Sequence, residues 1–168
     1  ISGASIPSPS IVQETADGRL VLAPVDKLSL LKQTGSSLDV VWRGKGSKPG
    51  SPSPIVYGDR VFVIARGGIL SAIELETGEQ AFKKRLKGTF WATPLAAEGR
   101  LYCINESGTA FVVDAAGKGE ILAKCDFGES IYGSPAVADD GMFVRSNAKL
   151  WKIAVIEQAR ATTGARQQ

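Results

Sequence analysis

Short apolar runs separated by turn residues recur along most of this chain. Examples are "DGRLVLA" from Asp17, "GDRVFVIA" from Gly58, "EGRLYCIN" from Glu98 and "DGMFVRS" from Asp140. Runs of about four to eight apolar, β-branched and aromatic residues, bounded by glycine and acidic turn residues, are typical of β-strands. No helical period competes with this pattern until the last dozen residues. The pattern therefore predicts an all-β fold.

The proline and turn residues that separate the apolar runs also repeat. Four units begin with a hydroxyl residue and a proline, and the last three of these pairs lie 40 and 41 residues apart: Ser8-Pro9, Ser53-Pro54, Thr93-Pro94 and Ser134-Pro135. Three runs follow each pair, and a fourth follows in three of the units. Each unit is therefore predicted to be a four-stranded antiparallel meander. The expected units are residues 5–46, 47–88, 89–128 and 129–156 of a domain over 1–156, with 157–168 as a C-terminal tail.

A four-stranded sheet of this size cannot bury both of its faces alone. Such units must pack on one another, and radial packing produces a β-propeller in which the first strand of each unit lines a central channel. A linear solenoid is the alternative, although its β repeats usually run shorter. The sequence thus predicts a β-propeller of four-stranded antiparallel blades, with about four blades present.

One stretch carries a family resemblance. The segment "LSAIELETGEQAFKKRL" from Leu70 has a Thr77-Gly78 turn followed by Phe82, and the first unit has Thr34-Gly35 and Trp42 in similar places. This arrangement resembles the PQQ-like (quinoprotein alcohol dehydrogenase-like) β-propeller repeat family, in particular its C-terminal blades. The resemblance implies a ring of seven or eight blades. We therefore expect the remaining blades in a longer parent chain, with a self-contained four-bladed ring as the alternative.

Composition and charge limit the partners. The 168 residues are 43% hydrophobic and 22% charged, as in ordinary soluble globular proteins. A net charge of +3 indicates a mildly basic surface, not the concentrated positive face of a nucleic-acid binder. No apolar run approaches the ~20 residues of a membrane-spanning helix. No signal peptide is visible. The family resemblance nevertheless implies a bacterial, exported protein, either periplasmic or extracellular.

The residue types present exclude several chemistries. The chain has no histidine, which removes Ser-His-Asp triads, Cys-His pairs and the commonest zinc ligand. Cys103 and Cys125 lack metal-ligand spacing and resemble small buried hydrophobic residues more than a disulfide, although a bridge stays open. No catalytic residue and no metal ligand is therefore predicted.

The resemblance also indicates what quinone binding would require. The enzyme family uses an acidic catalytic residue, a calcium or lanthanide site and often an adjacent cysteine pair. This chain has no adjacent cysteines, and its paired carboxylates, Asp139 and Asp140, precede a glycine in a predicted turn. No cofactor is expected, and PQQ with calcium enters only if the chain is part of a dehydrogenase.

Two aromatic residues are the better candidates for binding. Trp91 and Tyr132 occupy equivalent positions just ahead of the third and fourth hydroxyl-proline pairs, where the chain crosses between blades. If both rings lie on one face, they could bind a peptide or small ligand, since exposed Trp and Tyr are frequent anchors. The favoured expectation is instead that both rings pack between blades and fill the wedge between the twisted sheets. The turns between the second and third strands should place Arg66, Asn105 and Asn147 together on one face.

These observations lead to one functional prediction and two rivals. The chain is predicted to be a non-catalytic propeller scaffold with a protein or peptide partner, and a resemblance to the propeller lipoprotein of outer-membrane barrel assembly favours this role. The first rival is a fragment of a PQQ-dependent dehydrogenase whose catalytic residues lie in missing blades. The second is a sensor domain attached to an upstream kinase or peptidase.

Overall fold

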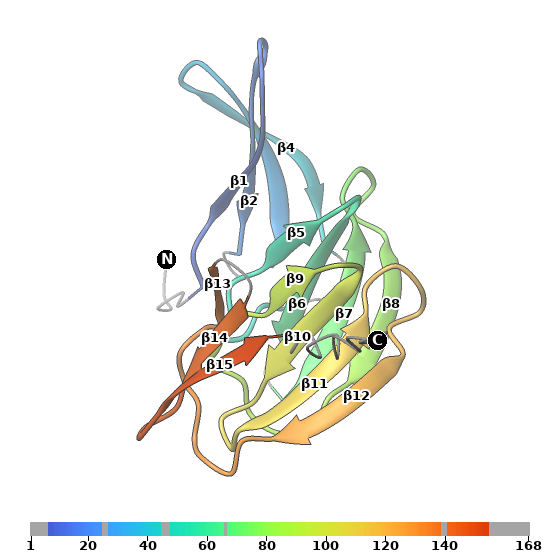
Figure 1. The fold of residues 1–168 in the computed structure, drawn as a ribbon. Coiled ribbons are helices and arrows are strands. Elements are labelled where there is room, and N and C mark those ends of the chain that lie inside the picture. Colours follow the sequence, from blue (N-terminus) through green and yellow to red (C-terminus); the bar gives the residue numbers. More distant parts are fainter. Residues whose placement is uncertain (1–6, 25–26, 45–47, 66, 139–140, 155–168) are drawn as a thin grey trace, which may run out of the picture.

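The computed structural model describes residues 7–24, 27–44, 48–65, 67–138 and 141–154, and all of its regular elements are β-strands (Figure 1). They are β1 (Ser10–Thr15), β2 (Gly18–Ala23), β3 (Ser29–Thr34), β4 (Ser37–Arg43), β5 (Ile55–Tyr57), β6 (Arg60–Ala65), β7 (Ile69–Glu74), β8 (Gln80–Arg85), β9 (Leu95–Ala97), β10 (Arg100–Ile104), β11 (Thr109–Asp114), β12 (Ile121–Asp126), β13 (Ala136–Ala138), β14 (Gly141–Arg145) and β15 (Leu150–Ala154). The expected tail over 157–168 lies outside the described residues. The all-β prediction is confirmed.

The strands form four antiparallel sheets in chain order. Blade 1 is β1–β4, blade 2 is β5–β8 and blade 3 is β9–β12, each with four strands, while blade 4 has the three strands β13–β15 within the described residues. Every neighbouring pair within a blade is antiparallel. The inner strands β5 and β9 contact each other across blades. The colours of Figure 1 change gradually from blue in blade 1 to red in blade 4, and the buried apolar clusters each join blades that are consecutive in sequence.

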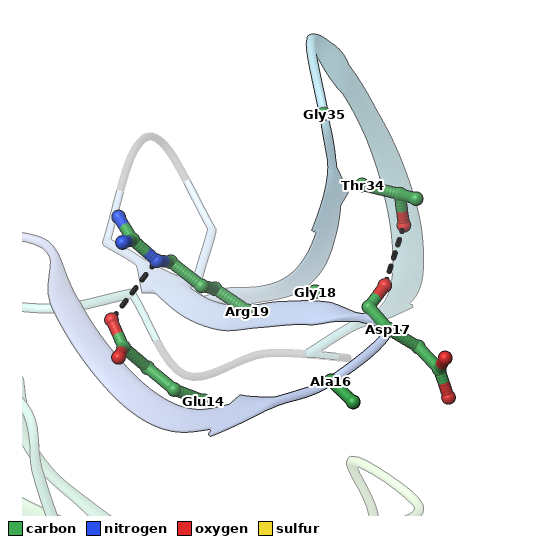
Figure 2. Close-up of a pocket in the computed structure, with 7 residues that line it drawn as sticks. All are labelled: Glu14, Ala16, Asp17, Gly18, Arg19, Thr34 and Gly35. Atoms are coloured by element: carbon green, nitrogen blue, oxygen red, sulfur yellow. Dashed lines mark hydrogen bonds and ion pairs between the residues drawn. The ribbon is translucent and has the colours of Figure 1, made fainter.

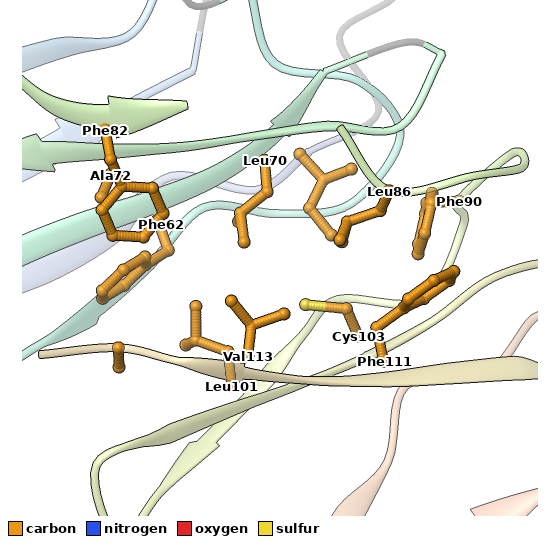
Figure 3. Packing of buried hydrophobic residues seen from close by; sticks show 12 residues of the cluster. Phe62, Leu70, Ala72, Phe82, Leu86, Phe90, Leu101, Cys103, Phe111 and Val113 are labelled. Atoms are coloured by element: carbon orange, nitrogen blue, oxygen red, sulfur yellow. The ribbon is translucent and has the colours of Figure 1, made fainter. Parts of the chain in front are cut away.

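Three apolar clusters lie between consecutive blades. The first joins blades 1 and 2 around Leu30, Trp42 and Val63, and the last joins blades 3 and 4 around Ile104 and Val144. The largest cluster joins blades 2 and 3 (Figure 3) and comprises Phe62, Ile64, Leu70, Ala72, Phe82, Leu86, Phe90, Leu101, Cys103, Phe111, Val113 and Ala115. Blade 2 therefore buries both of its faces, and this explains why β6 and β7 are almost continuously apolar.

An aromatic residue of β4 and one of β8 each pack on a turn glycine of the next blade. A Cβ atom at Gly78 would lie 2.7 Å from the Trp42 ring, and one at Gly119 would overlap the Phe82 ring. Both glycines have positive φ, and Trp42 Nε1 also donates a hydrogen bond of 2.7 Å to the Leu75 carbonyl. Turn glycines here thus serve both backbone conformation and close approach between blades.

The hydroxyl-proline pairs form a second link between blades. The Ser8 N–H donates to Ser53 Oγ at 3.0 Å, the Ser53 N–H to Thr93 Oγ1 at 3.0 Å, and the Thr93 N–H to Ser134 Oγ at 2.9 Å. We call these three bonds the hydroxyl ladder. Because proline follows each hydroxyl residue, the ladder residue itself is held in an extended conformation. The repeat recognised in the sequence is therefore also a hydrogen-bonding device.

The two cysteines are both free thiols in very different surroundings. Cys103 is buried between blades 2 and 3, whereas Cys125 is exposed on β12. Burial raises the pKa of the Cys103 thiol to about 12, because the thiolate would lose its hydration. The interpretation of Cys103 as a small buried hydrophobic residue is confirmed, but Cys125 does not fit it.

This difference predicts a split in thiol reactivity. Cys125 should react with a thiol-specific disulfide reagent in the native protein at neutral pH, whereas Cys103 should react only after unfolding, because the thiolate is the nucleophile. Counting the released chromophore before and after adding denaturant measures this. Reaction of both thiols at similar rates in the native protein would contradict the packing between blades 2 and 3.

Candidate functional site

Trp91 and Tyr132 lie on the two crossings between blades, β8 to β9 and β12 to β13. Their exposed fractions are 44% and 48%, while the preceding residues Phe90 and Ile131 are buried at 5% and 0%. Successive side chains of an extended segment point in opposite directions, so burying Phe90 and Ile131 turns the next residue outward. Phe90 and Ile131, not the two exposed rings, fill the space between blades.

Both rings meet one carboxylate. Trp91 Nε1 donates to Glu106 Oε2 at 3.2 Å, and Tyr132 Oη donates to Glu106 Oε1 at 3.2 Å. Glu106 is half-buried in the turn between β10 and β11. We call these three residues the Trp91–Glu106–Tyr132 cluster. It joins two equivalent crossings through the hairpin of the blade that lies between them.

The backbone of Glu106 holds the same two crossings. Its N–H donates to the Thr89 carbonyl at 2.8 Å, and its carbonyl accepts from the Ile131 N–H at 3.1 Å. Glu106 is therefore held by four hydrogen bonds, two made by its backbone groups and two accepted by its carboxylate. Such double anchoring reduces the freedom that a long exposed side chain would otherwise have.

Asn105 differs from this cluster because its side chain is buried, with 3% exposed. Its Nδ2 donates to the Lys87 carbonyl at 2.9 Å, and its Oδ1 accepts from Ser107 Oγ at 2.9 Å and from the Thr109 N–H at 2.8 Å. These bonds tie the β10–β11 turn to the end of blade 2. Asn105 therefore supports the position of Glu106 instead of facing a ligand.

We expect Asn105→Ala to lower the free energy of unfolding by about 2–3 kcal/mol. The change leaves the Lys87 carbonyl and the Thr109 N–H without their partner in a site with little solvent, and an unsatisfied buried group costs about 1–3 kcal/mol. Urea unfolding followed by intrinsic fluorescence measures this. The exposed Asn147→Ala variant is the matched control and should stay within about 0.5 kcal/mol. Equal effects of the two variants would contradict the assignment.

Asn147 lies on the equivalent hairpin of blade 4. It is exposed, and its N–H donates to the Ser130 carbonyl at 3.2 Å. Its neighbour Ser146 donates to Glu129, which also pairs with Lys149. Hydrogen bonds from Lys149 and then Ser146 lower the pKa of Glu129. Asn147 thus sits on a hairpin whose own charges are paired.

Arg66, the remaining candidate from the sequence, lies outside the described residues. Trp91 and Tyr132 are brought together, while Asn105 lies beneath them and Asn147 belongs to the next hairpin. Glu106 was missed by the sequence analysis. The signal was its position next to Asn105 in the turn that aligns with Arg66 and Asn147, but no sequence pattern indicates which residue of an irregular turn faces outward.

A depression lies at the β1–β2 and β3–β4 turns of blade 1 (Figure 2). Glu14 and Arg19 form an ion pair of 2.9 Å there, and Thr34 Oγ1 donates to the Asp17 carbonyl at 3.4 Å. It is lined by Glu14, Ala16, Asp17, Gly18, Arg19, Thr34 and Gly35. The ion pair is more than half exposed and contributes little, since exposed pairs are worth about 0–1 kcal/mol. No set of reactive groups converges in this depression.

The described residues contain neither a cluster of metal ligands nor a membrane-spanning helix. Within that part of the chain, no three cysteine or acidic side chains lie close enough together to hold a metal ion. The described residues also contain no helix of the length and hydropathy needed to cross a membrane.

Comparison with solved structures shows the same architecture. BamB from Moraxella catarrhalis matches with a TM-score of 0.66 and 17% identity, over 89% of this chain and 48% of that one. The computationally designed Ika4 protein matches with a TM-score of 0.62 and 12% identity, over 90% of this chain and 99% of that one. A europium-containing methanol dehydrogenase matches with a TM-score of 0.54 and 12% identity, over 67% of this chain and 23% of that one.

These likenesses establish the fold, a β-propeller of antiparallel blades, and the chain spans about half the length of BamB. No curated protein sequence matches the chain. Residues 29–121, more than half of the chain, match the PQQ-like repeat family described as outer membrane protein assembly factor BamB. The blades, their repeat and this match together show that the chain belongs to that family.

Proposed function

We propose that this chain is a non-catalytic propeller scaffold that binds a protein partner through the face carrying the Trp91–Glu106–Tyr132 cluster. One observation carries the proposal: two large aromatic side chains are nearly half exposed, yet both are held in place by hydrogen bonds to one anchored carboxylate. Exposed, preorganised Trp and Tyr side chains bind partners at a low cost in conformational entropy. The family description, outer membrane protein assembly factor, supports a protein partner. The expected location is periplasmic or extracellular.

The proposal includes further blades that complete a ring of seven or eight. An apolar row crosses all four strands of blade 1 on the face turned away from blade 2: Ile11 pairs with Val21, Val21 with Leu31 and Leu31 with Val40. Ile11 and Val40 are 57% and 47% exposed. Elsewhere in this chain a sheet face of this kind packs on a neighbouring blade. The intact mass of the product isolated from its source tests this, and a mass with no room for further blades would contradict it.

The test of partner binding is site-specific crosslinking. A photo-reactive phenylalanine analogue placed at position 132 should give discrete protein adducts in an envelope preparation of the source organism. The same analogue at position 122, where Leu122 is 53% exposed on the outer strand β12, is the matched control and should give none. The adducts should be lost when Glu106→Arg is added. Adducts of equal yield at both positions, or none at position 132, would overturn the proposal.

A titration of the full-length product isolated from its source distinguishes the enzyme alternative. Adding PQQ and calcium to that product should give no saturable change in quinone absorbance. Saturable, stoichiometric binding would instead favour a quinoprotein dehydrogenase whose catalytic residues lie on other blades.

A further inference from the structure

We infer that the Trp91–Glu106–Tyr132 cluster binds a cationic side chain, arginine or lysine, presented by the protein partner. This inference rests on the proposed function and names the chemistry that the face recognises. Three features of the cluster carry it: unused acceptor capacity on the carboxylate, two exposed aromatic rings beside it, and a filled counterpart on the next blade.

The Glu106 carboxylate has no ionic partner among the described residues, and part of its acceptor capacity is unused. A carboxylate offers about four acceptor positions, and the two aromatic donors use one on each oxygen. Both donors are neutral, so they orient the carboxylate without balancing its charge. A cation would supply the missing charge and bond to the remaining positions.

The two rings suit the same ligand. Trp91 and Tyr132 donate through an N–H and an O–H that lie in the ring plane, and these bonds leave the π faces unused. A cation placed over such a face is attracted by the ring quadrupole, most strongly for Trp. An anion would be repelled by Glu106, and an apolar group would have to strip water from it without replacing the lost hydration. The negative charge of the carboxylate and the π faces of the two rings therefore both favour a cationic ligand.

Blade 4 contains a filled version of this arrangement. Lys149 Nζ pairs with Glu129 and lies 5.2 Å from the centre of the Trp151 ring. One ammonium group there pairs with a carboxylate and also lies over an indole ring. The cation–ring contacts among the described residues involve Phe111, Phe143 and Trp151, not Trp91 or Tyr132. The cluster has the carboxylate and the rings of the filled site, and a partner would bring the cation.

The experiment is an NMR titration of this chain, read at the indole N–H of Trp91, which donates to Glu106. The probe is N-acetyl-arginine methylamide, the lysine counterpart is a second cation, and the citrulline counterpart has nearly the same shape without the charge. Both cations should shift the signal saturably, and citrulline should bind about tenfold more weakly. Glu106→Gln should also weaken arginine binding about tenfold. Glu120→Gln, an exposed carboxylate on the β11–β12 turn, should leave it unchanged.

Equal affinity for arginine and citrulline, or no effect of Glu106→Gln, would overturn the inference. If crosslinks still form at position 132 in that case, the scaffold function stands and the partner binds through other chemistry. If arginine binds as expected but no crosslink forms, the cluster is a receptor for small free cations, and both the proposed function and the assignment of the cation to a protein fall.

Discussion

Phe82→Ala is expected to lower the free energy of unfolding by about 3–5 kcal/mol, the usual range for truncating a buried phenylalanine. The Phe82 ring lies between blades 2 and 3 beside that of Phe62 (Figure 3), and the two ring centres are 6.3 Å apart. The Phe82 ring also lies where a Cβ atom at Gly119 would be. Removing it leaves a cavity that two stiff sheets cannot close. For a chain of this size such a loss is a large part of the total stability.

Guanidinium unfolding followed by circular dichroism measures this change. Leu122→Ala on β12 is the matched control, because Leu122 is 53% exposed and should cost at most about 0.5 kcal/mol. A loss below about 1 kcal/mol for Phe82→Ala would mean that blades 2 and 3 do not pack through this ring.

Gly119→Ala should cost about 3 kcal/mol or more for two separate reasons. Gly119 has φ +71, where a side chain is disfavoured by about 1–2 kcal/mol, and its new Cβ would overlap the Phe82 ring. Overpacking of this kind adds about 1–3 kcal/mol.

The control for Gly119→Ala is unusually close. Gly99 has the same φ of +71, but a Cβ there would meet nothing within 4 Å. Gly99→Ala should therefore cost only the backbone part, and the difference in unfolding free energy between the two variants isolates the contact between blades. In a Phe82→Ala background the extra cost of Gly119→Ala should vanish. Equal costs at positions 99 and 119 in the wild-type background would contradict this contact.

The repeat was predictable from sequence because its signals are local. Strand alternation, turn glycines and the spacing of Ser53-Pro54, Thr93-Pro94 and Ser134-Pro135 are all visible within one unit. The equivalent positions of Trp91 and Tyr132 were visible as well, but both rings were expected to pack between blades, and Phe90 and Ile131 fill that space instead. The sequence could not show which residue of a turn is buried and which faces solvent. Asn105 is therefore the predicted binding residue, although its side chain is buried and that of its neighbour Glu106 faces outward.

The contacts between blades were not predictable for a related reason. The sequence showed Phe82 and the glycine turns, but it could not show that Phe82 meets Gly119, 37 positions further along the chain. β-Bulges beside Trp42 and Phe82 change the register of β4 and β8 and alter which face of the sheet the residues beside the bulge occupy. A bulge of this kind has no clear signature in the amino-acid sequence.

The hydroxyl ladder gives the array of blades a polarity. In every rung the earlier blade donates its backbone N–H and the later blade accepts through a side-chain oxygen. A blade that extends the series beyond Ser134 must bring an acceptor, and one that precedes Ser8 must bring a donor. If a blade were added in the opposite orientation, two backbone N–H donors would face each other and this hydrogen bond could not form. Further blades can therefore continue the ladder only in head-to-tail order.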